Sequence, residues 1–319
     1  MTQIGGHIAA VRRPDALGVH SLDLVQVGVP DLQPAAAFYR AFGLDVREED
    51  GGLSLYTAGH AHRWVRFVEA KEKRLRCLCF GAFEDDMPRF RQRVRERGIA
   101  EIAPPPGHES NGLWLRDPDG LAIEIRVAEK SSPNAKTPMT MVSAPAGTAA
   151  APARSRQPAV RPRRLAHALL FSSDINRSLA FYEGALGLRL SDRSGDGIAF
   201  MHGIHGSDHH MIAFARSTGT GLHHLSWDVA SVNDIGLGAM QMADQGFAAG
   251  WGLGRHVLGS NYFHYVRDPW GSWSEYSADI DYIPVDHDWT SGDHPLEDAF
   301  YVWGPTPPAD FAVNREAAG

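Results

Sequence analysis

The sequence of 319 residues carries one pattern twice, and this internal repeat constrains the fold more than any other feature. In the first copy, apolar residues 24–32 lead into an amphipathic stretch that ends with Phe-Gly-Leu at 42–44. In the second copy, residues 167–175 lead into a similar stretch that ends with Leu-Gly-Leu at 186–188. An apolar segment followed by helical spacing, with a glycine at its end, predicts a strand and then a short helix in each copy.

Both copies also finish alike, with a turn followed by a strand. Residues 116–120 read Arg-Asp-Pro-Asp-Gly and precede Glu124, and residues 267–271 read Arg-Asp-Pro-Trp-Gly and precede Glu275 at the same spacing. Asp-Pro-x-Gly is typical of a type I turn, because proline supplies the required φ and glycine is accepted at the last position. We therefore expect each glutamate to lie on a strand that follows a tight turn.

A segment without hydrophobic periodicity separates the two copies. Residues 129–163 are rich in Pro, Ala, Ser, Lys and Arg, which is typical of an interdomain linker. We expect an N-terminal domain at residues 1–128, a second domain at 164–282 and an aromatic tail at 283–319. The length of the chain also favours two domains over one.

The composition excludes several classes of function. With 43% hydrophobic and 22% charged residues the chain is expected to fold, and its net charge of −7 argues against a nucleic-acid surface. The basic, Pro-rich run at 154–164 fits a linker better than a binding arm. Without a secretory pattern or a long apolar segment, we expect a cytoplasmic protein that does not enter membranes. Cys77 and Cys79 lie too close in sequence for a structural disulfide, which fits a reducing compartment.

The repeat and a longer motif in the second copy resemble a known family. Residues 20–128 and 164–280 each look like the module of the vicinal oxygen chelate superfamily, which contains glyoxalase I, bleomycin-resistance proteins and extradiol dioxygenases. The resemblance implies an α+β fold of two tandem βαβββ modules, each sheet curled around a cavity. Residues 254–275 resemble the signature of type I extradiol (catechol 2,3-dioxygenase-like) enzymes. One departure is His264, where the signature has an aliphatic residue or Phe; since it alternates away from Tyr265, we expect an effect on packing only.

Three residues of the second copy are expected to bind the metal that the resemblance implies. Eight of the sixteen histidines lie between His202 and His264, so the chemistry is concentrated in this half. His167 follows from the repeat, His224 lies on the polar face of a predicted strand, and Glu275 follows the tight turn. Singly, a strand histidine is more often structural. Together the three form the two-histidine, one-carboxylate set typical of non-haem iron(II) oxygenases, so we expect Fe(II), with Mn(II) as the alternative.

The first copy is expected to bind no metal. Its positions that match the metal histidines are Leu24 and Cys77, and neither side chain reproduces a neutral imidazole ligand. Glu124 remains, but a carboxylate beside Arg126 on a strand is more often a structural or solvated group.

The resemblance also implies residues that act on the substrate. A segment of the second copy resembles the one that carries the family's catalytic histidine, and its alignment selects His210 as the acid/base, with His209 pointing outward. Tyr265 and His256 are expected to donate hydrogen bonds to a substrate oxygen or an oxygen intermediate. His223 alternates with apolar residues and is expected to pack in the core.

The resemblance, together with these residues, implies an extradiol dioxygenase that inserts both atoms of O2 into a catechol-type ring next to its hydroxyl groups and gives a semialdehyde. We expect it to act as a homo-oligomer on a small catecholic substrate. Two other functions stay open: a glyoxalase-like isomerase or lyase with another divalent metal, and a metal-free binding module. The tail, with Trp289 and Tyr301, is expected either to cover the mouth of the cavity or to pack at a subunit interface.

Overall fold

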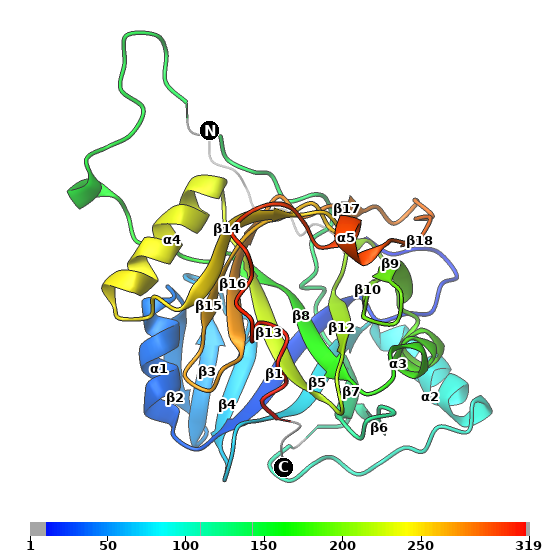
Figure 1. Ribbon diagram of the computed structural model, residues 1–319. Helices are drawn as coiled ribbons and strands as arrows, with labels where there is room; N and C mark the ends of the chain where they lie inside the picture. The colour runs from blue at the N-terminus through cyan, green and yellow to red at the C-terminus, as the bar shows by residue number, and fades with distance from the viewer. Residues whose placement is uncertain (1–10, 109, 142, 317–319) are drawn as a thin grey trace, which may run out of the picture.

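A computed structural model describes residues 11–108, 110–141 and 143–316, which form two large β-sheets with helices packed against them (Figure 1). The elements of the first domain are, in chain order, β1 (Ser21–Val29), α1 (Leu32–Ala41), β2 (Asp45–Glu49), β3 (Gly52–Tyr56), β4 (Val65–Glu69), β5 (Arg74–Ala82), α2 (Met87–Glu96), β6 (Leu113–Arg116) and β7 (Ala122–Val127). They build a seven-stranded sheet in the order β2-β3-β4-β1-β5-β7-β6.

The second domain repeats this arrangement and is extended by the tail. Its elements are β8 (Arg164–Ser172), α3 (Ile175–Phe181), a π-helical turn (Tyr182–Leu186), β9 (Arg189–Ser194), β10 (Ile198–His202), β11 (Ser207–Asp208), β12 (Ile212–Arg216), β13 (Gly221–Asp228), α4 (Val232–Asp244), β14 (Gly250–His256), β15 (Tyr262–Arg267) and β16 (Trp273–Ala278). The tail adds β17 (Tyr282–Ile283), β18 (Gly292–Asp293), α5 (Leu296–Ala299) and β19 (Tyr301–Trp303). Together they give a ten-stranded sheet in the order β18-β9-β10-β12-β8-β13-β16-β15-β14-β19, and a short pair of β11 with β17.

The predicted α+β class and the tandem arrangement are confirmed, and each domain is itself double. In the second domain, β8-α3-β9-β10-β12 is followed by β13-α4-β14-β15-β16, and the two units meet where β8 and β13 pair antiparallel at the centre of the sheet. The first domain has the same plan around β1 and β5, except that its second unit has two strands after the helix. In the first sheet, β5 is parallel to β7, which carries Glu124, and in the second sheet, β13 is parallel to β16, which carries Glu275.

The residues of the sequence repeat mark the ends of the first helix in each domain. Asp31 accepts a hydrogen bond from the amide of Gln33 at the start of α1, at 2.8 Å. Asp174 accepts one from the amide of Arg177 at the start of α3, at 3.0 Å. Such side-chain caps satisfy amides that have no partner inside a helix. The repeated glycine after each helix has a positive φ, which glycine adopts without the steric cost that a side chain brings.

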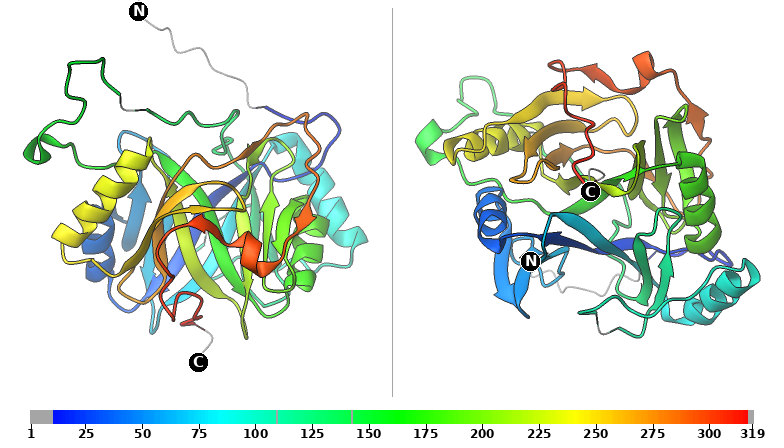
Figure 2. Two further views of the ribbon diagram at one scale, coloured as in Figure 1. Left: turned by 45° about the horizontal axis from the view of Figure 1, so that its top comes forward. Right: turned by 60° about the horizontal axis from the view of Figure 1, so that its bottom comes forward.

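The two domains share one hydrophobic core. In Figures 1 and 2, α1 of the first domain lies beside α4 of the second, and α3 of the second domain lies near α2 of the first. At the first contact, the rings of Phe42 and Tyr276 stack with centroids 3.8 Å apart, and the Tyr276 hydroxyl donates to the Phe42 carbonyl at 2.9 Å. At the second, the Tyr182 hydroxyl donates to Asp117 at 3.3 Å. The residues that end α1 and α3 therefore join the two domains.

The connection between the domains is mostly irregular and exposed. After β7 the chain runs through residues 128–141 and 143–163; this described part contains a short 3₁₀ turn at Arg154–Arg156, and some of it projects from the body in Figure 2. The basic run lies in this segment, apart from its last residue, Arg164, which begins β8. None of the helices in the described ranges is long and apolar enough to cross a membrane.

Candidate metal centre and substrate cavity

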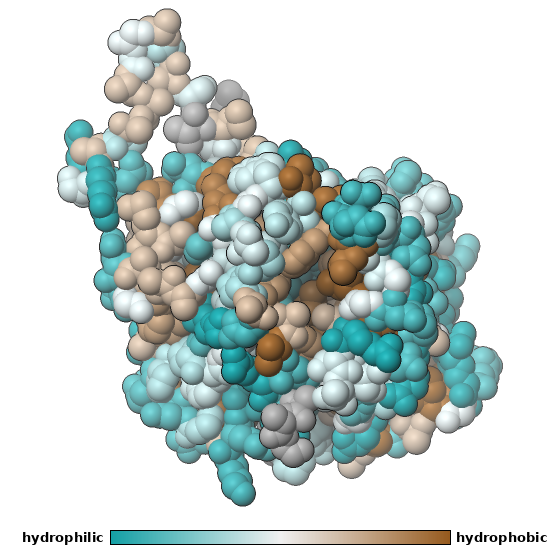
Figure 3. All heavy atoms as spheres, viewed as in Figure 1, coloured by the Kyte–Doolittle hydropathy of each residue, from teal (hydrophilic) through white to brown (hydrophobic). Residues whose placement is uncertain are grey.

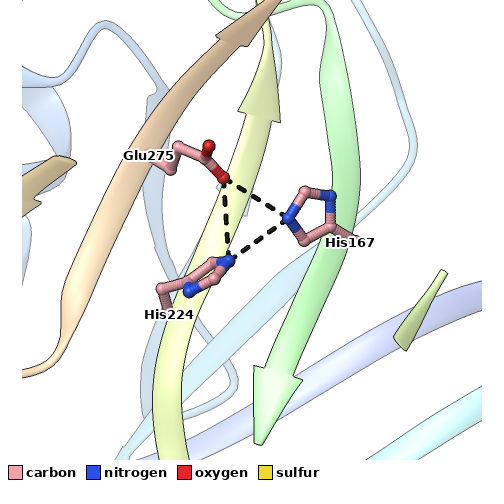
Figure 4. Close-up of side chains that lie close together, drawn as sticks. All are labelled: His167, His224 and Glu275. Atoms are coloured by element: carbon pink, nitrogen blue, oxygen red, sulfur yellow. Dashed lines mark hydrogen bonds and ion pairs between the residues drawn. The ribbon is translucent and has the colours of Figure 1, made fainter. Parts of the chain in front are cut away.

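Three strands of the second sheet bring His167, His224 and Glu275 together. They lie on β8, β13 and β16, and all three side chains are at least 96% buried (Figure 4). The Nε2 atoms of the two histidines are 3.2 Å apart. Oε2 of Glu275 lies 3.3 Å from Nε2 of His167 and 3.6 Å from Nε2 of His224. In the described residues, no other set of His, Cys, Asp and Glu side chains places three ligand atoms this close.

The geometry of these atoms fits one divalent metal ion. Bonds of about 2.1 Å at right angles put neighbouring ligand atoms about 3 Å apart, which is near the three separations found here. Oε2 of Glu275 accepts no hydrogen bond from the described residues although it is fully buried. Burial holds the pKa of His224 well below its ordinary value, so the imidazole is neutral, which is the form that binds metal. The three residues therefore form a two-histidine, one-carboxylate metal site.

Two side chains that sequence reasoning did not assign to the site hold the ligands in place. Asn261 donates from Nδ2 to Oε1 of Glu275 at 3.1 Å, which leaves Oε2 free for the ion. His223 contacts His224 through their Nδ1 atoms at 2.8 Å. The expectation that His223 packs in the core, away from the cavity, is wrong: it is buried but lines the cavity together with His224. A bulge in β13 between Leu222 and His224 interrupts the alternation of faces there. Such partners fix the orientation and tautomer of a ligand.

A cavity of about 250 Å³ opens beside the three ligands. Figure 3 shows hydrophobic side chains around a hollow at the centre of the face that Figure 1 presents. The walls are mainly apolar and aromatic, and they include Leu169, Phe200, Leu258, Leu296, Ala299, Phe300, Phe311 and Ala312. A mainly apolar cavity of this size, with a few polar groups from histidines at one end, is suited to a small organic ligand.

The tail forms one side of this cavity. Its residues Leu296, Phe300 and Phe311 line the space, and the Phe300 carbonyl accepts a hydrogen bond from Nδ1 of His256 at 2.9 Å. Further along, Trp273 donates to the Phe311 carbonyl at 3.0 Å. Of the two destinations expected for the tail, these contacts favour the mouth of the cavity.

His210 lines the same cavity, with its ring centroid 4.0 Å from that of His167. The expectation that His209 points outward is wrong. His209 is 1% exposed, its Nδ1 lies 3.0 Å from Nδ1 of His210, and its Nε2 lies 2.8 Å from Asp192. The reason is local: residues 209–211 lie between β11 and β12 and do not form strand, so the alternation of faces does not apply to them.

Tyr265 and His256 also line the cavity, but in this structure they bond to each other. Nε2 of His256 lies 2.9 Å from the Tyr265 hydroxyl. Since Nδ1 of His256 donates to the Phe300 carbonyl, a neutral ring accepts at Nε2 and the tyrosine is the donor. His256 is also 3.8 Å from Glu275. His264 is absent from the lining of the cavity, consistent with its expected place on the other face of β15.

The corresponding place in the first domain has a different chemistry. In the first sheet, Cys79 pairs with Leu24 on one side and with Glu124 on the other, as Ser226 pairs with His167 and Glu275 in the second. The strand register therefore equates Leu24 with His167 and Glu124 with Glu275. Two residues before Cys79 and Ser226, it equates Cys77 with His224. Both thiols are free. The alternative that Glu124 is solvated is wrong: it is fully buried, accepts a hydrogen bond from the Ser110 hydroxyl and lies 3.5 Å from Arg126.

With fold and site defined, the class of protein follows from comparison. The sequence profile of the Glyoxalase/Bleomycin resistance protein/Dioxygenase superfamily matches residues 21–125 and 164–276, and the chain belongs to this superfamily. Within it, the chain is 49% identical to metapyrocatechase 2 of Cupriavidus necator over 299 residues, which are 94% of this chain and 93% of the relative.

Solved structures share the fold over most of the chain. A Mn(II)-bound glyoxalase from Novosphingobium aromaticivorans superposes with a TM-score of 0.72 at 25% identity, over 92% of this chain and 96% of that one. An extradiol ring-cleaving dioxygenase from B. fuscum superposes with a TM-score of 0.73 at 19% identity, over 94% and 84%.

Proposed function

We propose that the protein is a type I extradiol dioxygenase that opens a catechol ring next to its two hydroxyl groups, as a catechol 2,3-dioxygenase does. The similarity to metapyrocatechase 2 along nearly the whole chain carries this conclusion. The metal site supports it, since two histidines and one carboxylate on one side of an ion leave the other side open to reactants.

His167, His224 and Glu275 would hold Fe(II), and Mn(II) accepts similar ligands. Iron(II), when bound, supplies open positions where a catechol and dioxygen react side by side. The apolar walls of the cavity exclude water from this reaction and orient the ring of the substrate.

His210 is the proposed acid/base. Burial, with neighbouring imidazoles adding to it, holds the pKa of His210 well below the ordinary value, so it is neutral and able to accept a proton from a catechol hydroxyl. It returns that proton later in the reaction, when the ring opens. Its ring centroid lies 4.0 Å from that of the proposed ligand His167, which supports a role beside the metal.

Tyr265 and His256 are proposed to position substrate oxygen atoms. The Tyr265 hydroxyl can turn from Nε2 of His256 toward an oxygen in the cavity, because both groups line it. Burial raises the pKa of Tyr265 well above its ordinary value, so the hydroxyl keeps its proton and remains a donor.

The test is oxygen uptake by anaerobically iron-loaded, full-length protein. We expect about one iron per chain, as one triad requires, and stoichiometric O2 consumption with a catechol to give a coloured ring-opened semialdehyde. A panel of substituted catechols then ranks the preferred ring substituents. Iron-loaded protein that binds iron but consumes no oxygen with any catechol would contradict the proposal.

A second function is favoured by one observation, the likeness to a Mn(II)-bound glyoxalase at 25% identity. A glyoxalase-like isomerase would convert a hemithioacetal without consuming oxygen. The same preparation loaded with Mn(II), Ni(II) or Zn(II) should therefore be assayed with the hemithioacetal of methylglyoxal and glutathione. The dioxygenase predicts no turnover in that assay.

We also infer that the enzyme works in a reducing cytoplasm and assembles as a homo-oligomer. The free thiols of Cys77 and Cys79 support the first point. For the second, β19 lies at the edge of the large sheet, where Val302 and Trp303 are 62% and 45% exposed. An apolar sheet edge of this kind favours association. Sedimentation velocity measures the assembly directly.

A further inference from the structure

A chain of hydrogen-bonded side chains runs from the cavity to the surface behind His210. Nδ1 of His210 lies 3.0 Å from Nδ1 of His209, and Nε2 of His209 lies 2.8 Å from Oδ2 of Asp192. The other carboxylate oxygen of Asp192, Oδ1, lies 2.9 Å from Nε2 of His294. His210, His209 and Asp192 are buried, whereas the side chain of His294 is 39% exposed.

Asp192 sets the direction of the hydrogen bonds in this chain. Partial burial disfavours its charge, but hydrogen bonds from His209, His294 and the Gly292 amide outweigh that effect and hold its pKa below the ordinary value. An ionised carboxylate only accepts, so His209 donates from Nε2. With the single proton of an uncharged imidazole on Nε2, Nδ1 of His209 is an acceptor, and the 3.0 Å contact then takes its proton from Nδ1 of His210.

One nitrogen of His210 remains after this assignment. A neutral imidazole carries a single proton, so with Nδ1 protonated its Nε2 is bare. His210 lines the cavity, and its Nε2 has no hydrogen-bond partner among the described residues. This atom is also not among the buried polar atoms that solvent cannot reach. The lone pair of Nε2 is therefore available to a molecule in the cavity.

We propose that Asp192 and His209 are positioning residues that hold His210 in the tautomer with its proton on Nδ1 and its bare Nε2 available to the substrate. The inference deepens the proposed function and rests on it, because His210 is the acid/base of that reaction. His294 and the Gly292 amide pin Oδ1 of Asp192, so that Oδ2 faces His209. Gly292 and Asp192 both lie in the second sheet, where they pair with each other across β18 and β9.

Aromatic neighbours keep the middle of the chain in place. The ring of His209 meets Trp289 edge to face, with centroids 5.4 Å apart, and Phe200 contacts both His209 and His210. Trp289 is itself fixed by a hydrogen bond from Nε1 to the Ser191 carbonyl at 3.0 Å. Rotation of either imidazole would disturb these contacts, which favours one orientation of each ring.

The first test measures the tautomer without any turnover. In full-length protein labelled with ¹⁵N-histidine and stripped of metal by a chelator, the His210 signals are assigned by their loss in His210→Asn. We expect the proton on Nδ1. In Asp192→Asn the new amide can donate to Nε2 of His209, which reverses the chain and moves the His210 proton to Nε2. Finding the proton on Nε2 in the unchanged protein would overturn the inference.

The second test measures the effect on the reaction in the iron-loaded enzyme. Loss of an orienting partner typically costs about 10- to 100-fold, so we expect Asp192→Asn to lower kcat by that factor, with iron content retained and the KM for catechol changed less than about twofold. His294→Ala should cost less, since the Gly292 amide still holds Oδ1. Asp192→Glu, which keeps an acceptor, should recover part of the loss.

Asp293→Asn is the matched control. Asp293 follows Gly292 on β18, and its carboxylate accepts a hydrogen bond from the Gly195 amide and none from His209, His210 or His294. It should leave kcat unchanged. Unchanged kcat in Asp192→Asn with a lowered melting temperature would show a purely structural role and overturn the inference. If no catechol is turned over at all, the proposed function fails, while the tautomer measurement still decides whether Asp192 orients His210.

Discussion

The two domains share the strand plan and register around their central strands, yet in the described residues only the second presents a metal site. At four matching positions the second domain has His167, His224, Glu275 and Tyr265. The first has Leu24, Cys77, Glu124 and Trp114, as the pairing of Tyr265 with Glu275 and of Trp114 with Glu124 shows. The difference teaches that the fold depends on the apolar residues and turns that both copies keep, whereas the metal site depends on a few side chains.

The first domain fills the equivalent space with its own side chains. Leu24, Cys77, Cys79, Trp114 and Ala122 form a separate buried cluster there. Hydrogen bonding with Cys79, opposed by burial and helped by His108, lowers the pKa of Cys77. The retained glutamate is bound by neighbours instead of being left free. The first domain therefore packs apolar side chains where the second has its metal site, and it contributes to the core that both domains share.

The largest contrast is expected between the two matching glutamates. Glu275→Gln removes a charged ligand from the buried triad, so we expect loss of iron and a fall in oxygen uptake of about 1,000-fold or more. Glu124→Gln should keep the iron and most of the activity, because no metal depends on it. Iron per chain and oxygen consumption are measured side by side. Equal iron loss in both variants would break the comparison of the domains.

A smaller loss is expected when the acid/base is replaced but the ligands stay. His210→Asn should lower kcat by about 100- to 10,000-fold, the usual contribution of a positioned proton donor and acceptor. Iron content should stay near that of the unchanged enzyme, since His210 only touches a ligand. If kcat is unaffected, another residue moves the proton and His210 has lost its proposed role.

Tyr265 and Trp114 give a third, weaker contrast. Tyr265→Phe removes one hydroxyl donor from the cavity but keeps the ring, so we expect kcat to fall about 10-fold, in line with one lost hydrogen bond of about 1.4 kcal/mol. Trp114→Phe at the matching position should leave kcat unchanged. Steady-state kinetics of the two variants decide the point, and a larger effect at Trp114 would speak against it.

An effect on stability with little effect on turnover is expected at Leu24, which is 3% exposed in the buried cluster of the first domain. Leu24→Ala should cost about 2–5 kcal/mol of stability through the cavity it leaves. The activity per folded chain should change less than about twofold. Thermal unfolding and oxygen uptake are compared on the same sample. Loss of iron binding in this variant would show that the metal site depends on packing in the first domain, and it would contradict the comparison.

Much of the site follows from the sequence because its signals are local. The Asp-Pro-x-Gly turn predicts the strand that carries Glu275, and the repeat aligns His167 with Leu24. The alternation of faces fails where regular strand is interrupted: His209 lies outside β12, and His223 lies at a bulge of β13. Asn261 and Asp192 carry no local signal, because their roles arise from contacts between segments far apart in the chain.

The tail has a consequence for how the enzyme is made. Glu316 near its end forms a buried ion pair with Lys73 of the first domain and accepts a hydrogen bond from the amide of Leu222 in the second, at 2.9 Å. In the sequence, Phe300 and Phe311 lie between β16 and Glu316, and both side chains form part of the cavity wall. The ribosome synthesises the tail after both domains. A nascent chain can therefore form the strands that carry the metal ligands before the tail completes the cavity wall.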